Sequence, residues 1–355
     1  MKTRIALLVI SLLALAGLAL WFRAPEQEKG SVLSQRNKPE RQSIIIDNTT
    51  PFVSDRTGSE QLMIYSEATD SSLRLLPSTE DQFLPRMNGR GELWYFTESS
   101  GFYRLWRMAD TKEEPVMVMA LRSRPVRLTV SQSGEYGIYT IEQNSPEIRR
   151  RSFVFSTSTG EVEEIGQEIR GESFSPDGRS FVYASASGLW YRELLTIGTL
   201  TDALQLATGS IWAPSLQADG SALYLSEEEG GVGLYRAGLR GQSNELLISL
   251  PGSPQVVSWT MDVAPNGLQA VYTAVTDYQL LQGQIGFLSL ADPVNTEVIS
   301  DSGIAAQWSA DEETIWYNQL SLGSGEATAQ IWRMYPDGNY REAITTEGNN
   351  WLTVP

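Results

Sequence analysis

A short turn motif recurs along the chain at a nearly constant interval. Two regular copies are SFSPDGRSFVYAS at residues 173–185 and MDVAPNGLQAVYTA at residues 261–274. The turn position is occupied in order by Gly91, Gly134, Gly178, Gly220, Gly267 and Glu312, at intervals of 43, 44, 42, 47 and 45 residues. Such a period predicts a repeat architecture in which each repeat is one supersecondary unit.

Each copy has the pattern of a β-hairpin followed by further strands. Pro fixes the first corner of the turn, Asp or Asn caps it, and Gly accepts the positive φ between antiparallel strands. An alternating aromatic and β-branched strand follows. Third strands are expected at residues 102–108, 151–156, 188–194, 284–290 and 329–334, and fourth strands begin at residues 161 and 341. Four strands per repeat predict an all-β propeller of four-stranded blades.

The two ends of the repeat region predict how the ring closes. Residues 62–67 (LMIYSE) read as one more second strand without a clear inner strand before it. Residues 349–355 (NNWLTVP) read as an inner strand that stops before its turn. Pairing the N- and C-terminal strands would leave no open blade edge. We therefore expect seven blades, with six as the alternative.

The S-P-D-G turn at residues 175–178, followed by an aromatic-rich strand, resembles the repeat of TolB-like (PD40, WD40-like) β-propellers. The resemblance covers about residues 60–355. It is strongest in the copies at Ser175 and Ala264, whereas Glu312 replaces the turn glycine in one copy. It implies a non-enzymatic protein-interaction module of the cell envelope, with another envelope protein as its partner.

The amino terminus predicts export of the body. Lys2 and Arg4 precede an apolar run at residues 5–22, which is the lower limit for spanning a bilayer. We interpret residues 1–23 as a signal anchor, or alternatively as a signal peptide cleaved after Ala16 or Ala19. Residues 24–43 read as a flexible polar stalk and residues 44–355 as the propeller. The body is then periplasmic and held at the inner membrane, or secreted after cleavage.

Composition excludes several functions. The chain has no Cys and no His, which removes disulfides, thiol nucleophiles and every Ser-His-Asp triad. Residues 1–42 hold seven basic side chains and three acidic ones, so the remainder holds 20 basic and 40 acidic ones. A body with this net charge repels nucleic acid. We predict no catalytic, cofactor-binding or metal-binding residue, and we assign Asp177 and Asp219 to turn capping rather than to calcium.

One feature differs from this acidic background. Arginines gather where one blade passes to the next and between the second and third strands of that next blade, namely Arg122, Arg124, Arg127, Arg149, Arg150 and Arg151. In such propellers both loop types open on one face, so these residues, here called the arginine patch, are a candidate site for a carboxylate-rich partner or a phosphate. The alternative interpretation is that they neutralise Glu135, Glu142, Glu147 and Glu172.

A different class of function also stays open. The central channel of a propeller could serve a small-ligand receptor, or a hydrolase or lyase, because loops from all blades converge there. A buried cluster of carboxylates or arginines in the channel would favour that alternative. Fold alone does not decide between the two.

Overall fold

The computed structural model describes residues 49–353, except residues 67–68, 77, 110–112, 146, 197–198, 229–230, 240–243, 251–255, 292, 294–295, 310 and 323–326. The chain divides into a unit at residues 1–42 and a unit at residues 43–355. The anchor predicted at residues 1–23 and the stalk predicted at residues 24–43 lie outside the described residues. No helix that is long and apolar enough to cross a membrane occurs within the described ranges.

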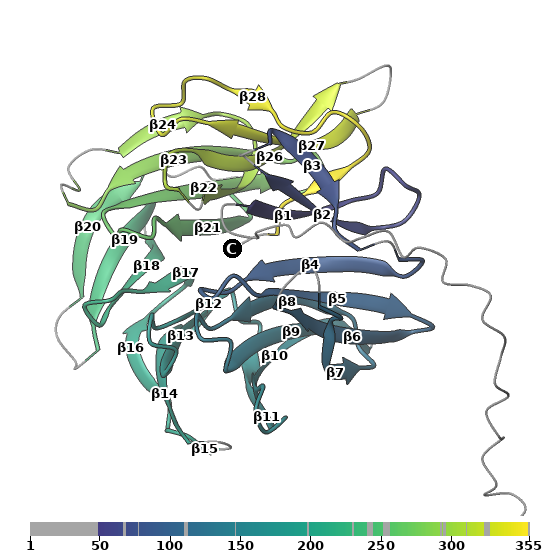
Figure 1. The fold of residues 1–355 in the computed structure, drawn as a ribbon. Coiled ribbons are helices and arrows are strands. Elements are labelled where there is room, and N and C mark those ends of the chain that lie inside the picture. Colours follow the sequence, from purple (N-terminus) through teal and green to yellow (C-terminus); the bar gives the residue numbers. More distant parts are fainter. Residues whose placement is uncertain are drawn as a thin grey trace, which may run out of the picture. The chain divides into compact units, whose positions relative to one another are not determined.

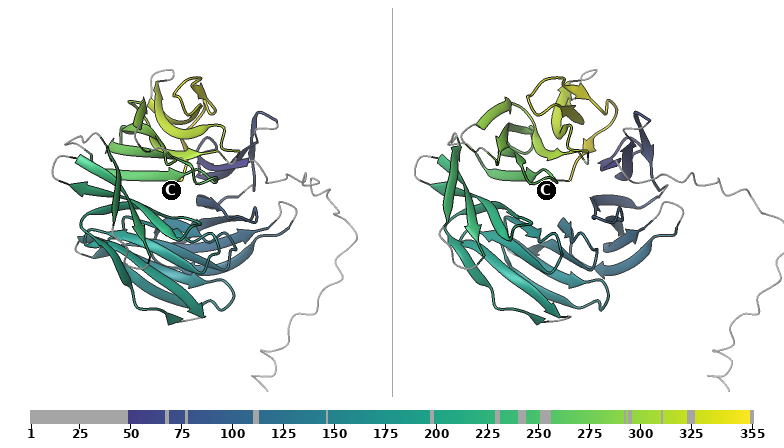
Figure 2. Two further views of the ribbon diagram at one scale, coloured as in Figure 1. Left: turned by 90° about the vertical axis from the view of Figure 1, so that its left-hand side faces the viewer. Right: turned by 60° about the vertical axis from the view of Figure 1, so that its left-hand side comes forward.

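The described strands form seven antiparallel sheets, which are the blades of a propeller (Figure 1). Figure 2 shows these sheets arranged in a ring. Blade 1 contains β4 (Asp81–Met87), β5 (Leu93–Ser99), β6 (Phe102–Met108) and β7 (Val116–Leu121). Blade 2 contains β8 (Pro125–Val130), β9 (Tyr136–Ser145), β10 (Glu147–Ser156) and β11 (Val162–Gln167). Blade 3 contains β12 (Gly171–Phe174), β13 (Ser180–Ser185), β14 (Gly188–Thr196), β15 (Thr199–Leu200) and β16 (Leu204–Thr208).

The remaining blades complete the ring. Blade 4 contains β17 (Ile211–Leu216), β18 (Ser221–Glu228), β19 (Gly231–Gly238) and β20 (Glu245–Leu250). Blade 5 contains β21 (Ser258–Val263), β22 (Gln269–Asp277), β23 (Gln282–Ser289) and β24 (Thr296–Ser300). Blade 6 contains β25 (Ile304–Trp308), β26 (Ile315–Leu322), β27 (Ala327–Met334) and β28 (Glu342–Ala343). Blade 7 contains β29 (Asn350–Trp351), β1 (Thr49–Ser54), β2 (Gln61–Ser66) and β3 (Ser71–Arg74).

The predicted turn connects the first two strands of blades 1 to 6. All six predicted turn positions have a positive φ, from 63° at Glu312 to 80° at Gly220. The backbone N–H of each donates to the carbonyl three residues earlier, at 2.8–3.1 Å. Asp177 accepts the backbone N–H of Arg179 at 3.0 Å, and Asp219 accepts that of Ser221 at 2.8 Å. The carboxylates therefore cap their turns as the sequence predicts.

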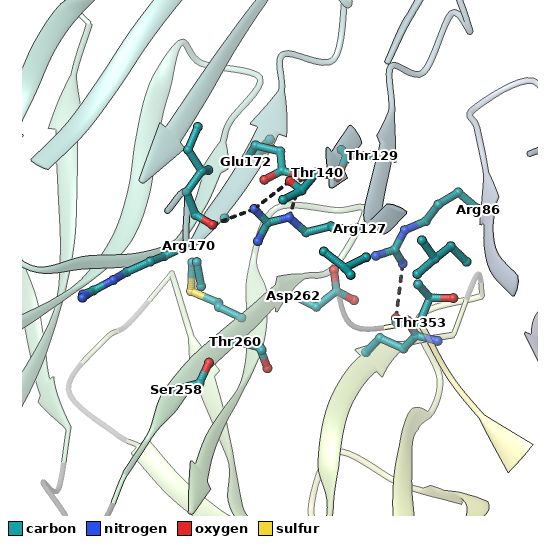
Figure 3. A pocket seen from close by; sticks show the side chains of 18 of the residues that line it. Arg86, Arg127, Thr129, Thr140, Arg170, Glu172, Ser258, Thr260, Asp262 and Thr353 are labelled. Atoms are coloured by element: carbon teal, nitrogen blue, oxygen red, sulfur yellow. Dashed lines mark hydrogen bonds and ion pairs between the residues drawn. The ribbon is translucent and has the colours of Figure 1, made fainter. Parts of the chain in front are cut away.

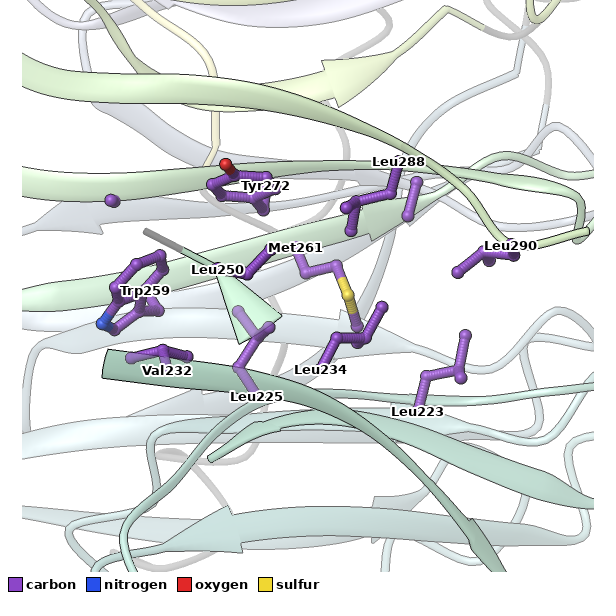
Figure 4. Packing of buried hydrophobic residues seen from close by; sticks show 12 residues of the cluster. Leu223, Leu225, Val232, Leu234, Leu250, Trp259, Met261, Tyr272, Leu288 and Leu290 are labelled. Carbon is purple, nitrogen blue, oxygen red and sulfur yellow. The ribbon is translucent and has the colours of Figure 1, made fainter. Parts of the chain in front are cut away.

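The core lies between neighbouring blades. The second strand of blade 1, β5, is buried without interruption from Leu93 to Thr97, because blades cover it on both faces. Figure 4 shows one such interface, in which Leu225 and Leu234 of blade 4 pack against Met261 and Tyr272 of blade 5. Trp94 has no exposed surface, so this aromatic side chain packs between the blades.

Closure joins the two ends of the described chain. β29 pairs with β1 through Val53 opposite Trp351 and Ser54 opposite Asn350. The predicted pairing of N- and C-terminal strands is therefore confirmed, and so is the count of seven blades. One detail is wrong: residues 62–67 were expected to be a second strand, but β2 (Gln61–Ser66) is the third strand of blade 7, because β1 lies between β2 and β29.

Side chains strengthen this short pairing. Asn318 of β26 donates to the Asn350 carbonyl at 2.7 Å and accepts the Leu352 N–H at 2.8 Å. Asp55, just after β1, accepts the backbone N–H of Asn349 at 2.6 Å. Polar contacts from β26 and from Asp55 thus hold a strand that is only two residues long.

The strand directions give the propeller two different faces. The turn glycines lie on one face, here called the turn face. The connections between blades and the turns between second and third strands lie on the other, here called the mouth face. The backbone N–H of Glu142, near the end of β9, donates to the carbonyl of Arg124 at 3.1 Å. This bond brings both kinds of connection together at blade 2.

Candidate functional site

A cavity of about 1450 Å³ runs between the inner strands of the blades. At the mouth face, Arg124, Arg150 and Arg170 line one part of its wall, and Val257 and Tyr278 of blade 5 line another. The charged residues of the whole lining are Arg86, Arg124, Arg127, Arg150, Arg170, Glu60, Glu168, Glu172 and Asp262. The cavity thus holds five arginines and four carboxylates, whereas the unit as a whole has twice as many acidic as basic side chains.

Four of these residues form a charge cluster deep in the channel (Figure 3). Arg86 comes from β4, Arg127 from β8, Glu172 from β12 and Asp262 from β21, so four blades each contribute one residue. Glu172, Asp262 and Arg127 all act electrostatically on Arg86. Two cations and two anions therefore share one region of low solvent access, where charges interact strongly.

Arg127 and Glu172 are joined across the boundary between blades 2 and 3. Arg127 Nε lies 3.0 Å from Glu172 Oε1, and the Glu172 side chain has no exposed surface. The Thr129 hydroxyl donates to the same carboxylate oxygen at 3.0 Å. Arg127 Nη2 also donates to the Ile169 carbonyl at 2.8 Å. These contacts fix the Arg127 guanidinium in one orientation.

Arg86 spans from blade 1 to its neighbours on both sides. Its Nε donates to the Leu128 carbonyl of β8 at 2.8 Å, and its Nη1 donates to the Thr353 carbonyl of the closing segment at 3.2 Å. Burial lowers the pKa of Arg86 to about 10, an effect that Glu172 and Asp262 partly oppose. The side chain therefore remains a cation at neutral pH.

Asp262 is the counterpart of Arg86 in blade 5. Its Oδ2 accepts the backbone N–H of Trp308 at 2.8 Å. Burial raises the pKa of Asp262 to about 6, although the Trp308 hydrogen bond and the charge of Arg86 both lower it. This carboxyl consequently changes its charge close to physiological pH.

The structure divides the arginine patch. Arg124, Arg127 and Arg150 line the cavity. Arg122 lies outside it, with its guanidinium carbon 6.0 Å from the centroid of the Phe102 ring. Arg151 forms an ion pair with Glu164 and lies 5.2 Å from the Phe153 ring centroid.

The position expected for residues 149–151 needs a correction. They belong to β10 and do not lie in a loop between the second and third strands, because the β9–β10 hairpin extends to Ser145 and Glu147. Arg149 is opposite Gln143 in this hairpin. Successive side chains of a strand point to opposite faces, so Arg150 is separated from its two neighbours.

Two of the acidic partners considered above are in contact with the patch. Arg150 Nη2 lies 3.1 Å from Glu142 Oε1, and Arg127 is paired with Glu172 as described. Arg150 nevertheless keeps 55% of its side chain exposed. The ion pairs thus coexist with a cationic surface at the channel mouth.

Arg86 and Asp262 were not among the site residues predicted from the sequence, although both lie in copies of the repeat, before the turn positions Gly91 and Gly267. Each stands five residues before its turn position, where other copies have Thr129, Ser173 and Ser215. All five residues line the cavity. The position five residues before the turn therefore faces the channel. A charged residue at that position was the sequence signal that could have identified Arg86 and Asp262.

Comparisons with known proteins give similarity at the level of fold. No protein-family model matches the sequence, and no curated protein matches it. An oligogalacturonate lyase from Vibrio parahaemolyticus has a TM-score of 0.57 at 11% identity, covering 77% of this chain and 83% of the lyase. A puromycin-hydrolyzing peptidase from Mycobacterium tuberculosis has a TM-score of 0.59 at 13% identity, covering 85% of this chain and 52% of the peptidase.

Similar solved structures also include TolB from Acinetobacter baumannii, with a TM-score of 0.48 at 14% identity. That likeness covers 73% of this chain, which spans 65% of the TolB chain. The propeller fold implied by the sequence resemblance is established by the seven sheets themselves. Proteins that share a fold this widely have different activities, so function has to be argued from the site.

Proposed function

We propose that this protein is a non-enzymatic binding propeller of the cell envelope, held outside the cytoplasm by the segment at residues 5–22. It engages an envelope protein partner at the arginine-lined mouth of its channel. The observation that carries this proposal is the concentration of five arginines in the cavity of a strongly acidic body. A partner segment rich in carboxylates is attracted to the mouth and repelled elsewhere, which gives both binding and orientation.

Two arginines are suited to testing the proposal. Arg124 is exposed beside the Phe83 ring, 5.7 Å from its centroid, and Arg150 is exposed beside Glu142. Neither lies deep in the channel wall, so serine at both positions should leave the fold intact. Arg90 and Arg179 are exposed in turns on the opposite face and serve as matched controls.

The experiment compares three forms of the full chain in affinity capture from native cells, followed by quantitative mass spectrometry. We expect a stoichiometric envelope partner with the native chain and with the Arg90→Ser/Arg179→Ser control. The Arg124→Ser/Arg150→Ser form should lose most of that partner. Equal recovery by all three forms would show that binding does not use the mouth. An intact Met1 in the captured chain would support the anchor, and a new terminus near Ala16 or Ala19 would support cleavage.

A second candidate is an enzyme of the channel, and the Arg86–Asp262 pair is the observation that favours it. A carboxyl with a pKa of about 6 is suited to proton transfer near neutral pH. Arginine neighbours could hold a substrate carboxylate. The similar fold of the oligogalacturonate lyase suggests an acidic oligosaccharide as the first substrate to assay. Turnover by the native chain that Asp262→Asn abolishes would support this candidate, whereas absence of turnover would exclude that reaction.

A further inference from the structure

Two arginines of the arginine patch are held by aromatic rings. In blades 1 and 2, ion pairs with carboxylates of the chain are made by Arg104, Arg107, Arg127, Arg150 and Arg151. Arg122 and Arg124 differ, because their guanidinium carbons lie 6.0 Å from the Phe102 ring centroid and 5.7 Å from the Phe83 ring centroid. Within the part of the chain that the structure describes, neither of these two guanidinium groups makes a hydrogen bond or an ion pair.

The rings determine where the two side chains lie. Phe102 begins β6 at the hairpin between the second and third strands of blade 1, and it is 44% exposed. Phe83 is buried and belongs to an aromatic group, with ring centroids 6.0 Å from Phe96 and 6.2 Å from Tyr103. A cation–π contact attracts a guanidinium without occupying its N–H donors. The rings therefore hold both arginines in place and leave their donors for another acceptor.

Both arginines lie on the connection from blade 1 to blade 2, at the mouth face. This connection runs from the end of β7 to the start of β8, and the Arg124 carbonyl accepts the Glu142 N–H at 3.1 Å. Arg124 lines the cavity and Arg122 lies outside it, and both residues are exposed. The pair therefore leads from the channel mouth outward over the rim of blade 1, beside Phe102.

Carboxylates of the chain compete unequally for the arginines of the mouth. Arg150 donates from Nε and Nη2 to Glu142 Oε1, at 3.2 and 3.1 Å. Glu60 is close enough for its charge to interact with that of Arg124, although these two described side chains form no ion pair. A carboxylate from outside must therefore compete with Glu142 at Arg150, whereas it meets no paired carboxylate at Arg124.

We propose that Arg122 and Arg124 bind two carboxylates of an acidic peptide segment of the envelope partner, and that Phe102 contacts an apolar side chain of that segment. The inference rests on the proposed function and narrows it to these contacts. Each guanidinium can bind a carboxylate through two parallel N–H···O bonds. Side chains two residues apart in an extended segment point to the same side, so carboxylates at alternate positions suit two arginines separated by one residue.

Fluorescence anisotropy of the full chain tests the site with a short dye-labelled peptide in which glutamate alternates with serine and which ends in phenylalanine. An exposed carboxylate–guanidinium pair contributes a factor of about three to affinity, so Arg122→Gln/Arg124→Gln should bind this peptide about tenfold more weakly. Arg90→Gln/Arg179→Gln removes the same charge from the turn face and should bind it as the native chain does. Equal losses in the two double variants, or equal binding of a peptide with glutamine in place of glutamate, would overturn the proposal.

Two single variants and one competitor examine the details. Arg150→Gln should weaken peptide binding less than Arg124→Gln, because Glu142 already occupies donors of Arg150. Phe102→Leu should weaken binding without changing its salt dependence, whereas the arginine variants should reduce that dependence, since salt screens charges. Displacement of the peptide by inorganic phosphate at constant ionic strength would assign the pair to a phosphate ligand and contradict the carboxylate assignment.

Affinity capture separates this inference from the proposed function. Loss of the envelope partner by the Arg122→Gln/Arg124→Gln form supports both. If that form recovers as much partner as the native chain, while the Arg124→Ser/Arg150→Ser form loses it, binding uses the mouth but not this pair, and only the present inference is wrong. If the native chain captures no partner, the proposed function is contradicted, and the peptide assay alone decides whether the pair binds carboxylates.

Discussion

Closure of the ring by Asn318 leads to a quantitative prediction. The Asn318 side chain is 1% exposed and makes hydrogen bonds to the Asn350 carbonyl, the Leu352 N–H and the Gln330 carbonyl. In Asn318→Ala the first two groups, on the closing segment, lose a partner inside the protein. Each buried polar group left without a partner costs about 1–3 kcal/mol. We therefore expect the variant to lose about 4 kcal/mol of unfolding free energy, which is a large part of the stability of an ordinary domain.

The assay is equilibrium unfolding in urea, followed by tryptophan fluorescence and by far-UV circular dichroism. Hydrogen exchange should in addition show faster exchange of the Leu352 amide than in the native chain. Asn339→Ala is the matched control, because Asn339 is exposed in a turn of the same blade and its side-chain amide donates to the nearby Asp337 carboxylate. The reasoning is refuted if Asn318→Ala unfolds at the same urea concentration as the control and Leu352 keeps its protection.

Three further predictions concern other parts of the fold. Removal of residues 349–355 should lower the melting temperature sharply, as measured by calorimetry, and an unchanged value would contradict closure by β29. Gly178→Ala should reduce the unfolding free energy by about 1–2 kcal/mol, because φ is 70° there, and an unchanged midpoint of urea unfolding would contradict this reasoning. Asp262→Asn should raise the unfolding free energy by about 3 kcal/mol at pH 8 and by progressively less toward pH 4, since an acid whose pKa is raised on folding destabilises the native state only above its unfolded value. A gain that does not change with pH would show that the Asp262 charge is not its cause.

The turn spacing predicts the fold because every repeat has the same two requirements, a left-handed turn position and strands that are buried between neighbouring blades. Gly91, Gly134 and Gly178 occupy equivalent left-handed positions, and the strands between them are buried between neighbouring blades in the same way. The spacing does not reveal which terminal strands share a blade, since β1 departs from the aromatic-rich pattern. For that reason residues 62–67 were expected to be the second strand of blade 7, whereas β2 is its third strand.

The charge cluster was harder to predict, because backbone irregularity decides which residues of an inner strand face the channel. β4 has a register shift between Phe83 and Arg86, and Leu84 within it has a φ of 51°. A bulge interrupts the strict alternation of side chains, so counting residues along the strand does not show where Arg86 points. The length of the β9–β10 hairpin posed a similar problem for residues 149–151, since its polar sequence resembles a loop.

The composition of blade 7 has a consequence for biosynthesis. Its three outer strands, β1 to β3, are the first part of the propeller to be made, and β29 is part of the last. During synthesis the growing chain can complete blades 1 to 6 in order. Meanwhile β1 has no inner strand to pair with, because β29 has not yet been made. The ring therefore cannot be finished until Leu352 has been synthesised, so blade 7 is the last blade to form.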